Sequence, residues 1–172
     1  DIILCAGPHH YREIRKSEKY YNTKRKKLYK YGYPRLEEIH KFKIKNNSVA
    51  DKKIILIAPS WGSNSITNLC IENIIQNLIT ENFEVIYRPH NMSLINNKKI
   101  IDKILNKFSK FKNFKFDNSN NAFDSLLKAD LLIADWGSTA ADFSLGLEKP
   151  VIFIDTPPKI KNKDYKYIFS SA

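Results

Sequence analysis

The sequence predicts an α/β fold with a doubly wound, mostly parallel, Rossmann-like sheet. From residue 53 to residue 154, short apolar segments alternate with segments of helical periodicity, which is typical of parallel strands joined by right-handed crossovers. The segment Leu131–Ala134 is wholly apolar, as expected of a strand covered on both faces. It leads into Asp135–Thr139, small polar residues at the start of a helix. Backbone N–H groups and the helix dipole favour an anion at such a place.

The first part of the chain is expected to be less regular. An apolar strand precedes a charged, exposed helix over Tyr11–Tyr21. The stretch Leu28–Arg35 indicates a turn that ends beside Pro34, a residue that favours the first turn of a helix. The helix that follows is expected to fray into Lys45–Ser48, the best candidate for a linker.

Periodicity defines the remaining elements, and Lys98–Phe108 keeps the clearest helical period. The expected strands, in chain order, are Ile2–Ala6, Lys53–Ala58, Phe83–Tyr87, Phe114–Phe116, Asp130–Ala134 and Val151–Ile154. The expected helices are Tyr11–Tyr21, Leu36 to about Phe42, Ile66–Ile79, Lys98–Phe108, Asn121–Lys128 and Thr139–Leu147. The helix over residues 66–79 is expected to bury one face, made of Ile66, Leu69, Cys70, Ile74 and Leu78.

Ligands of doubly wound sheets bind beyond the carboxyl ends of the strands, near the point where the strand order reverses. Four loops with polar residues directly follow apolar strands and can meet there. They are Pro59–Ser65, Pro89–Met92, Asp135–Thr139 and Asp155–Pro158.

The composition is that of a globular protein, with 42% apolar residues and no apolar run long enough to span a bilayer. Its 172 residues fit one domain, or one domain and a fragment of another. The chain begins at Asp1 without a leader, so we expect a piece of a longer protein with no export signal. Cys5 and Cys70 lack metal-ligand spacing, so reduced thiols and a cytoplasmic protein are expected.

The net charge is +11 and the pI is near 9.5. The lysines gather in clusters over Lys24–Lys30, Lys41–Lys45, Lys98–Lys99 and Lys159–Lys166. Two interpretations stay open. The clusters are either an ordinary solvated surface, or they attract a polyanion such as a polymeric phosphate, anionic lipid headgroups or nucleic acid.

The loop Asp135–Thr139 is the first candidate site, with Gly137, Ser138 and Thr139 expected to bind phosphate at the helix start. The alternative is an ordinary helix start, because Thr139 and Asp142 resemble a capping box. The chain contains neither G-x-G-x-x-G nor a Walker sequence, so no dinucleotide cofactor or ATPase chemistry is indicated.

Arg88 and His90 follow the strand Phe83–Tyr87. An arginine can hold a phosphate through two parallel hydrogen bonds. His90 could donate a proton, or a charged hydrogen bond, to a phosphate leaving group, and it is the catalytic candidate. The alternative is a loop histidine that packs against a neighbouring carbonyl.

Ser60 and Trp61 follow the strand Lys53–Ala58, and Ser65 is a plausible N-cap for the next helix. Trp61 either lines a cleft and stacks on a base or sugar, or anchors the loop on the core. The adjacent His9 and His10 fit no metal pattern. We expect no metal and no cofactor, and hydrolase chemistry is unsupported.

Taken together, the motifs resemble the carboxyl-terminal half of the CDP-glycerol glycerophosphotransferase family, which includes teichoic-acid primases and polymerases. The likeness extends from Leu28 to Pro158. The segments that carry it are Tyr31–Arg35, Ile54–Trp61, Tyr87–His90, Asp130–Asp142 and Lys149–Asp155. Family members have a two-domain GT-B fold whose second domain holds the CDP-alcohol donor.

The resemblance implies roles for several residues. Arg88 and His90 match an Arg-x-His segment that meets the donor pyrophosphate. Asp135–Ser138 match an Asp-Tyr-Ser-Ser loop, and Asp142 matches an acidic residue that could accept hydrogen bonds from ribose hydroxyls. The chain departs from the family in having Trp136, Gly137 and Asn91 where the family has Tyr, Ser and often Pro. One hydroxyl that could bond the phosphate is therefore missing, although a glycine N–H can still serve.

We therefore expect a transferase domain that binds a nucleotide donor for cell-envelope polymers such as teichoic acid or capsule. Residues 1–27 would be a crossing segment or a remnant of the amino-terminal domain, and residues 28–172 the donor-binding domain. This piece alone should bind donor but turn over little, because the family's acceptor half is missing. The expected acceptor is polyanionic or lipid-linked, and the expected location is the cytoplasm or the inner membrane face.

Two other functions remain as alternatives. One is a UDP-sugar glycosyltransferase or 2-epimerase-like domain on the same GT-B fold. The other is a non-catalytic polyanion-binding module, although nucleic acid is an unlikely partner because no nucleic-acid motif is present.

Overall fold

The computed structural model describes residues 1–45, 52–158, 162–164 and 166–168. Contacts divide the chain into two compact units. Unit 1 comprises residues 1–37 with the described part of 159–172, and unit 2 comprises residues 38–158. The division into a crossing segment over residues 1–27 and a donor-binding domain over residues 28–172 stays a prediction.

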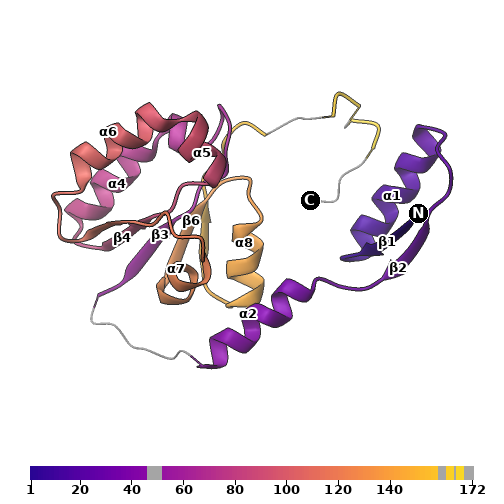
Figure 1. Cartoon of the computed structure of the whole chain (residues 1–172), viewed down its shortest axis with the longest axis horizontal. Helices are drawn as coiled ribbons and strands as arrows, with labels where there is room; N and C mark the ends of the chain where they lie inside the picture. The colour runs from indigo at the N-terminus through magenta and orange to yellow at the C-terminus, as the bar shows by residue number, and fades with distance from the viewer. Residues whose placement is uncertain (46–51, 159–161, 165, 169–172) are drawn as a thin grey trace. The chain divides into compact units, whose positions relative to one another are not determined.

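Unit 2 is built on a five-stranded parallel sheet with the order β5-β4-β3-β6-β7 (Figure 1). Its strands are β3 (Ile54–Ile57), β4 (Glu84–Tyr87), β5 (Phe114–Phe116), β6 (Leu131–Ala134) and β7 (Val151–Phe153). The chain runs outward from β3 to β5 and then returns to β6, on the other side of β3. The switch point of strand order therefore lies between β3 and β6, and the predicted doubly wound fold is confirmed.

Helices cover both faces of this sheet (Figure 1). On one face, α3 (Ile66–Leu69), α4 (Ile71–Thr80) and α6 (Lys98–Phe108) pack on the odd-numbered residues of β3. On the other face, α2 (Pro34–Lys45), α7 (Phe123–Lys128), α8 (Thr139–Ala141) and the π-helical turn η1 (Asp142–Gly146) share a core with Leu56. A strand buried on both sides explains why β3 and β6 are wholly apolar.

The predicted bounds of α6 and β5 agree with the structure, but the predicted helix over residues 66–79 is wrong. It breaks at Cys70, whose φ of −150° lies outside the helical range, into α3 and α4. Beyond the break, Ile71, Ile75 and Ile79 are buried, whereas Leu69, before it, is 53% exposed. Of the predicted face, Ile66 is buried and Cys70, Ile74 and Leu78 are partly buried against the same core, so the prediction erred at Leu69 and missed the three most deeply buried residues of α4.

Two further expectations need correction. The expected turn over Leu28–Arg35 begins as a strand, because β2 (Lys27–Lys30) pairs in parallel with β1 (Ile2–Cys5). The residues after Pro89 form the helix α5 (Asn91–Asn96) instead of an open loop. The expected linker was Lys45–Ser48. Lys45 is the last residue of α2, and residues 46–48 lie outside the described residues.

Unit 1 holds β1, β2 and the helix α1 (Pro8–Tyr20). Glu18 of α1 is 8% exposed, and its carboxylate accepts hydrogen bonds from Lys26 N (2.7 Å) and Arg15 Nη1 (2.6 Å). The backbone hydrogen bond from Lys26 is the larger cause of the lowered pKa of Glu18, followed by the bond from Arg15. This buried carboxylate joins α1 to the segment that enters β2.

Both cysteines are free thiols, as predicted, with Cys5 buried and Cys70 half-buried. Burial raises the pKa of the Cys70 thiol. Within the described part of the chain, no helix combines the length and the apolar character that crossing a bilayer requires.

Candidate functional site

The loops that follow β3 and β6 are joined at the switch point by Asp135. Its carboxylate is 1% exposed and accepts hydrogen bonds from Ser60 N (2.5 Å) and Ile66 N (2.8 Å). Ile66 is the first residue of α3, so Asp135 satisfies an amide at the start of that helix. Ser65 occupies the predicted N-cap position, but its side chain makes no capping hydrogen bond. The structure therefore gives Asp135 the task of positioning both loops.

Gly137 brings the second loop close to the first. A Cβ atom added at Gly137 would lie 3.7 Å from the Cβ of Ser60, so the two chain segments are in contact distance. The N–H of Gly137 donates to the carbonyl oxygen of Asp135 (2.7 Å). This amide, which was expected to face a phosphate, is used inside the loop instead.

Ser138 immediately precedes the helix α8, and its side chain is exposed. It makes no capping hydrogen bond. The capping box of Thr139 and Asp142 stays a prediction. The first intrahelical bond runs from Asp142 N to Ser138 O (3.1 Å). The amides of residues 139–141 thus precede the first helical hydrogen bond, where helices leave donors for other partners.

His90 and Trp61 lie next to each other although they follow different strands. Their ring centroids are 6.2 Å apart and the rings are tilted by 35°. His90 is the N-cap of α5, and its Nδ1 accepts a hydrogen bond from Met92 N (3.1 Å). Because Nδ1 acts as an acceptor, the neutral ring carries its proton on Nε2. His90 is exposed, so Nε2 can serve as a donor at the carboxyl edge of the sheet.

Arg88 makes contacts that the sequence did not indicate. Its Nη1 lies 2.7 Å from Asp117 Oδ2 and 3.1 Å from Ser119 Oγ, and its Nη2 donates to Ser119 O (2.8 Å). Its side chain is only 14% exposed. These contacts fix the side chain of Arg88 within the loops after β4 and β5, and its predicted phosphate contact stays a prediction.

Asp117 is the functional candidate that sequence reasoning missed. It directly follows β5, so the rule that singled out the other loops could have found it. Its carboxylate accepts hydrogen bonds from Ser125 Oγ and Ser119 N in addition to Arg88. Burial raises the pKa of Asp117, but the bonds from Ser125, Ser119 and Arg88 outweigh burial and hold it well below its usual range. The residue is a fixed anion that connects β5, α7 and Arg88.

Two other predicted residues lie away from solvent or face another loop. Asp142 is 3% exposed within η1, which leaves little of it for a ribose. Trp136 is 53% exposed, and its Nε1 donates to Thr156 O (2.6 Å), so it joins the loops after β6 and β7. In the described ranges, no group of three or more His, Cys, Asp or Glu side chains could hold a metal ion.

The site thus combines exposed donors with buried acceptors. In the loops after β3, β4 and β6, the one carboxylate, Asp135, is buried and bonded to amides, whereas His90 and Ser138 are exposed. Trp61 is half-buried beside His90 and offers part of a ring face. An edge with this chemistry suits an anionic ligand that carries a flat group.

Known proteins resemble this chain in sequence and in fold. The family model described as CDP-Glycerol:Poly(glycerophosphate) glycerophosphotransferase matches residues 3–158. A teichoic acid poly(glycerol phosphate) polymerase of Bacillus spizizenii is 30% identical over 141 residues, which is 71% of this chain and 33% of that protein. The chain therefore spans about a third of the curated relative's length.

Solved structures show the same fold. A variant of the wall teichoic acid polymerase TagF, soaked with CDPG, is 24% identical with a TM-score of 0.52, over 89% of this chain and 37% of that one. The UDP-GlcNAc 2-epimerase of Methanocaldococcus jannaschii, in complex with UDP-GlcNAc and UDP, is 19% identical with a TM-score of 0.56, over 76% and 40%. Both likenesses support the GT-B-type, Rossmann-like sheet.

Proposed function

The chain belongs to the CDP-Glycerol:Poly(glycerophosphate) glycerophosphotransferase family, and we propose that unit 2 is the donor-binding domain of a cell-envelope polymer transferase. The donor is CDP-glycerol or a related CDP-alcohol. The observation that carries this proposal is the edge of the sheet at the switch point, whose loops contain the exposed His90 and Ser138 and the buried, amide-bonded Asp135.

In this proposal the donor diphosphate lies against Ser138 and the amides that begin α8. Ser60 and Thr139, each half-buried, line the same edge. Asp135 holds the two loops together without contacting the ligand, and Asp142 supports the helix from inside. Arg88 acts through Asp117 and Ser119, which keep the backbone before His90 in place. Trp61 offers a ring face for the base or the ribose.

The reaction would transfer glycerol phosphate to an acceptor hydroxyl. The acceptor oxygen attacks the phosphorus that bears glycerol, the bond from that phosphorus to the bridging oxygen breaks, and CMP leaves. His90 Nε2 donates a hydrogen bond to the departing phosphate, where negative charge develops. The proton of the acceptor hydroxyl goes to a base that we assign to the amino-terminal half of such enzymes. We propose that this chain alone binds donor but turns over little.

Because the fold is also similar to that of the epimerase, a second candidate function is the binding of a UDP-sugar. The test is a calorimetric titration of the chain with CDP, CDP-glycerol, UDP and UDP-GlcNAc. Selective binding of CDP and CDP-glycerol supports the proposal, selective binding of UDP-GlcNAc supports the second candidate, and no binding of any of them contradicts both.

Two histidine variants test whether CDP-glycerol binds beside His90. His90→Ala should lower the affinity for CDP-glycerol, whereas His40→Ala, which changes an exposed histidine on α2, should leave it unchanged. Equal affinities of the two variants would place the ligand away from His90.

We propose a polyanionic or lipid-linked polymer as acceptor. We also propose a cytoplasmic location with contact to the inner membrane face, where a lipid-linked acceptor would be held. Co-sedimentation of the chain with phosphatidylglycerol vesicles tests the membrane contact, and a chain that stays in the supernatant at low salt contradicts it.

A further inference from the structure

The positive charge of this protein is concentrated in unit 1. Residues 1–37 and 159–172 contain 14 of the 29 lysines and arginines but only 5 of the 18 acidic residues. Their net charge is +9, out of +11 for the whole chain. Unit 2 is more than twice as long and is almost neutral. If the lysines were only an evenly solvated surface, the net charge would not differ so strongly between unit 1 and unit 2.

The tyrosines follow the same division. Eight of the nine lie in residues 1–37 and 159–172. Six of these, Tyr20, Tyr21, Tyr29, Tyr31, Tyr33 and Tyr167, are between 41% and 70% exposed. Tyr87, the tyrosine of unit 2, is fully buried. Unit 1 therefore presents aromatic rings and positive charges together.

A cleft of about 500 Å³ in unit 1 is lined by Lys16, Lys19, Tyr20 and Tyr167. The rings of Tyr20 and Tyr167 are stacked, with centroids 5.6 Å apart and planes within 10°. Lys16 and Lys19 lie three residues apart on α1, so they occupy one side of that helix. We call these four residues the lysine–tyrosine cleft.

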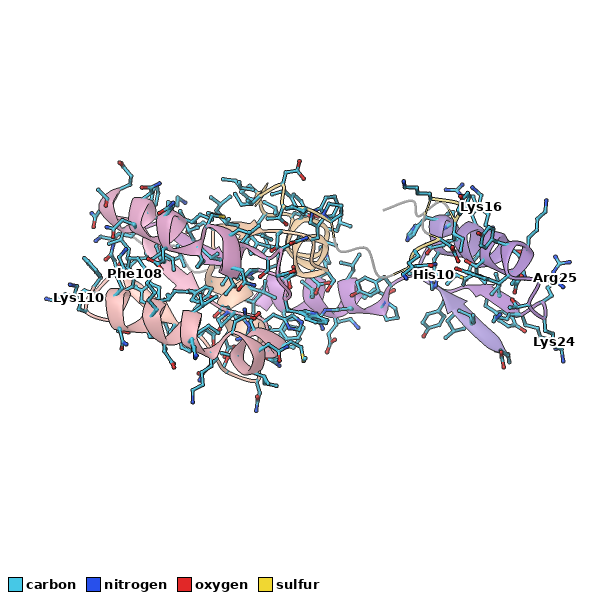
Figure 2. All side chains as sticks on the ribbon, turned by 90° about the horizontal axis from the view of Figure 1, so that it is seen from above. His10, Lys16, Lys24, Arg25, Phe108 and Lys110 are labelled. Carbon is cyan, nitrogen blue, oxygen red and sulfur yellow. The ribbon has the colours of Figure 1, made fainter. Side chains whose placement is uncertain are left out.

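Neighbouring contacts hold the cleft in shape. Tyr21 packs edge-on against Tyr20, with centroids 5.0 Å apart, and its hydroxyl lies 3.2 Å from both Asn162 Oδ1 and Asp164 Oδ2. The segment that carries Tyr167 is thereby joined to the end of α1. Figure 2 shows Lys16 on α1, and Lys24 and Arg25 on the segment that leads into β2. The positive charge of unit 1 thus extends beyond the cleft.

We propose that the lysine–tyrosine cleft binds a polyol phosphodiester chain, the acceptor polymer of the proposed function, on which this inference rests. Ammonium groups pair with phosphodiesters as point charges. Tyrosine rings offer an apolar face to the carbon skeleton of a polyol and a hydroxyl to its oxygens. A chain that alternates phosphate and polyol therefore matches a cleft made of lysines and stacked tyrosines.

The test measures binding of a synthetic oligo(glycerol phosphate) to the whole chain at several salt concentrations. Lys16→Gln/Lys19→Gln should lower the affinity by about tenfold or more and reduce the salt dependence, because fewer counterions are released. The matched control, Lys98→Gln/Lys99→Gln, removes two exposed lysines from unit 2 and should change little. An equal loss in both double variants would overturn the proposal.

Tyr167→Ala separates the contribution of the ring from that of charge. Because Tyr167 is 70% exposed, we expect the variant to stay folded. It should weaken binding of the oligomer but not of inorganic polyphosphate, which lacks the polyol. An unchanged affinity for the oligomer contradicts the cleft. Binding to phosphatidylglycerol vesicles without binding to the oligomer also contradicts it, in favour of a lipid surface.

A parallel titration with CDP-glycerol distinguishes the two proposals. In one outcome the chain binds the oligomer, loses this binding in Lys16→Gln/Lys19→Gln, and binds no nucleotide. That outcome supports the lysine–tyrosine cleft and contradicts the donor-binding function. Nucleotide binding without oligomer binding removes the cleft and leaves the donor site.

Discussion

The carboxylate of Asp135, at the end of β6, accepts a hydrogen bond from the first amide of α3, Ile66 N, at 2.8 Å. Its second oxygen binds Ser60 N in the loop before that helix. One side chain therefore sets the distance between the two loops that border the switch point. This relationship makes the shape of the site depend on a residue that need not touch a ligand.

We expect Asp135→Ala to destabilise unit 2 by roughly 1–3 kcal/mol, because two amides lose their acceptor. Asp135→Asn keeps one oxygen acceptor and should recover part of that loss. Both variants should also weaken nucleotide binding, since the loops lose their common anchor. Chemical denaturation and calorimetry on the same samples check the two effects. Full stability of Asp135→Ala would show that the bonds at Ser60 and Ile66 contribute nothing.

The order of the strands and helices in unit 2 could be predicted because the apolar pattern depends only on near neighbours in the sequence. The relationship of Asp135 to Ile66 could not, because it joins residues that only the closed sheet brings together. The same holds for Arg88, because an arginine two residues before a histidine suggested a phosphate ligand, whereas its observed partners, Asp117 and Ser119, lie in the loop after β5. The break at Cys70 left no signal in the periodicity, so the most deeply buried residues of α4, Ile71, Ile75 and Ile79, were not predicted.

The pair of Asp117 and Arg88 should make stability depend on pH. The folded state holds the pKa of Asp117 well below its ordinary value of 3.8, although burial alone would raise it. A carboxyl with a lowered pKa stabilises the fold above its ordinary pKa, and this contribution disappears as the pH falls toward the lower value. We expect the free energy of unfolding to decline below about pH 5. The decline should be smaller in Asp117→Asn, and an identical decline in both proteins contradicts the assignment.

A double-mutant cycle measures whether Asp117 and Arg88 act together. Removing one partner leaves a largely buried charge, so Asp117→Asn and Arg88→Met should each cost roughly 2–4 kcal/mol. The double variant should cost less than the sum, because no charge is left unpaired. Urea denaturation of the four proteins gives the coupling. Additive losses would mean that the 2.7 Å contact carries no specific energy.

Ser138→Ala separates binding from stability, because Ser138 makes no capping hydrogen bond. The free energy of unfolding should change by less than about 0.5 kcal/mol. A hydrogen bond to a charged phosphate contributes about 1.5–3 kcal/mol, so the affinity for CDP should fall about 10- to 100-fold. Ser63→Ala, at an exposed serine in the loop after β3, is the control and should leave affinity unchanged. A loss of stability without a loss of affinity would mean that Ser138 supports the start of α8 and does not bind phosphate.

We assign two tasks to His90, because Nδ1 accepts a hydrogen bond from Met92 N and the neutral ring then carries its donor on Nε2. His90→Ala removes both and should cost up to about 1 kcal/mol as a lost N-cap. His90→Asn supplies another good N-cap, so stability should return, but the shorter side chain lacks the Nε2 donor. Nucleotide affinity should therefore stay low in both variants. Trp61 lies beside His90, and its fluorescence offers a second readout of ligand binding at this edge. Recovery of affinity together with stability in His90→Asn would mean that the cap, and not Nε2, is what the nucleotide requires.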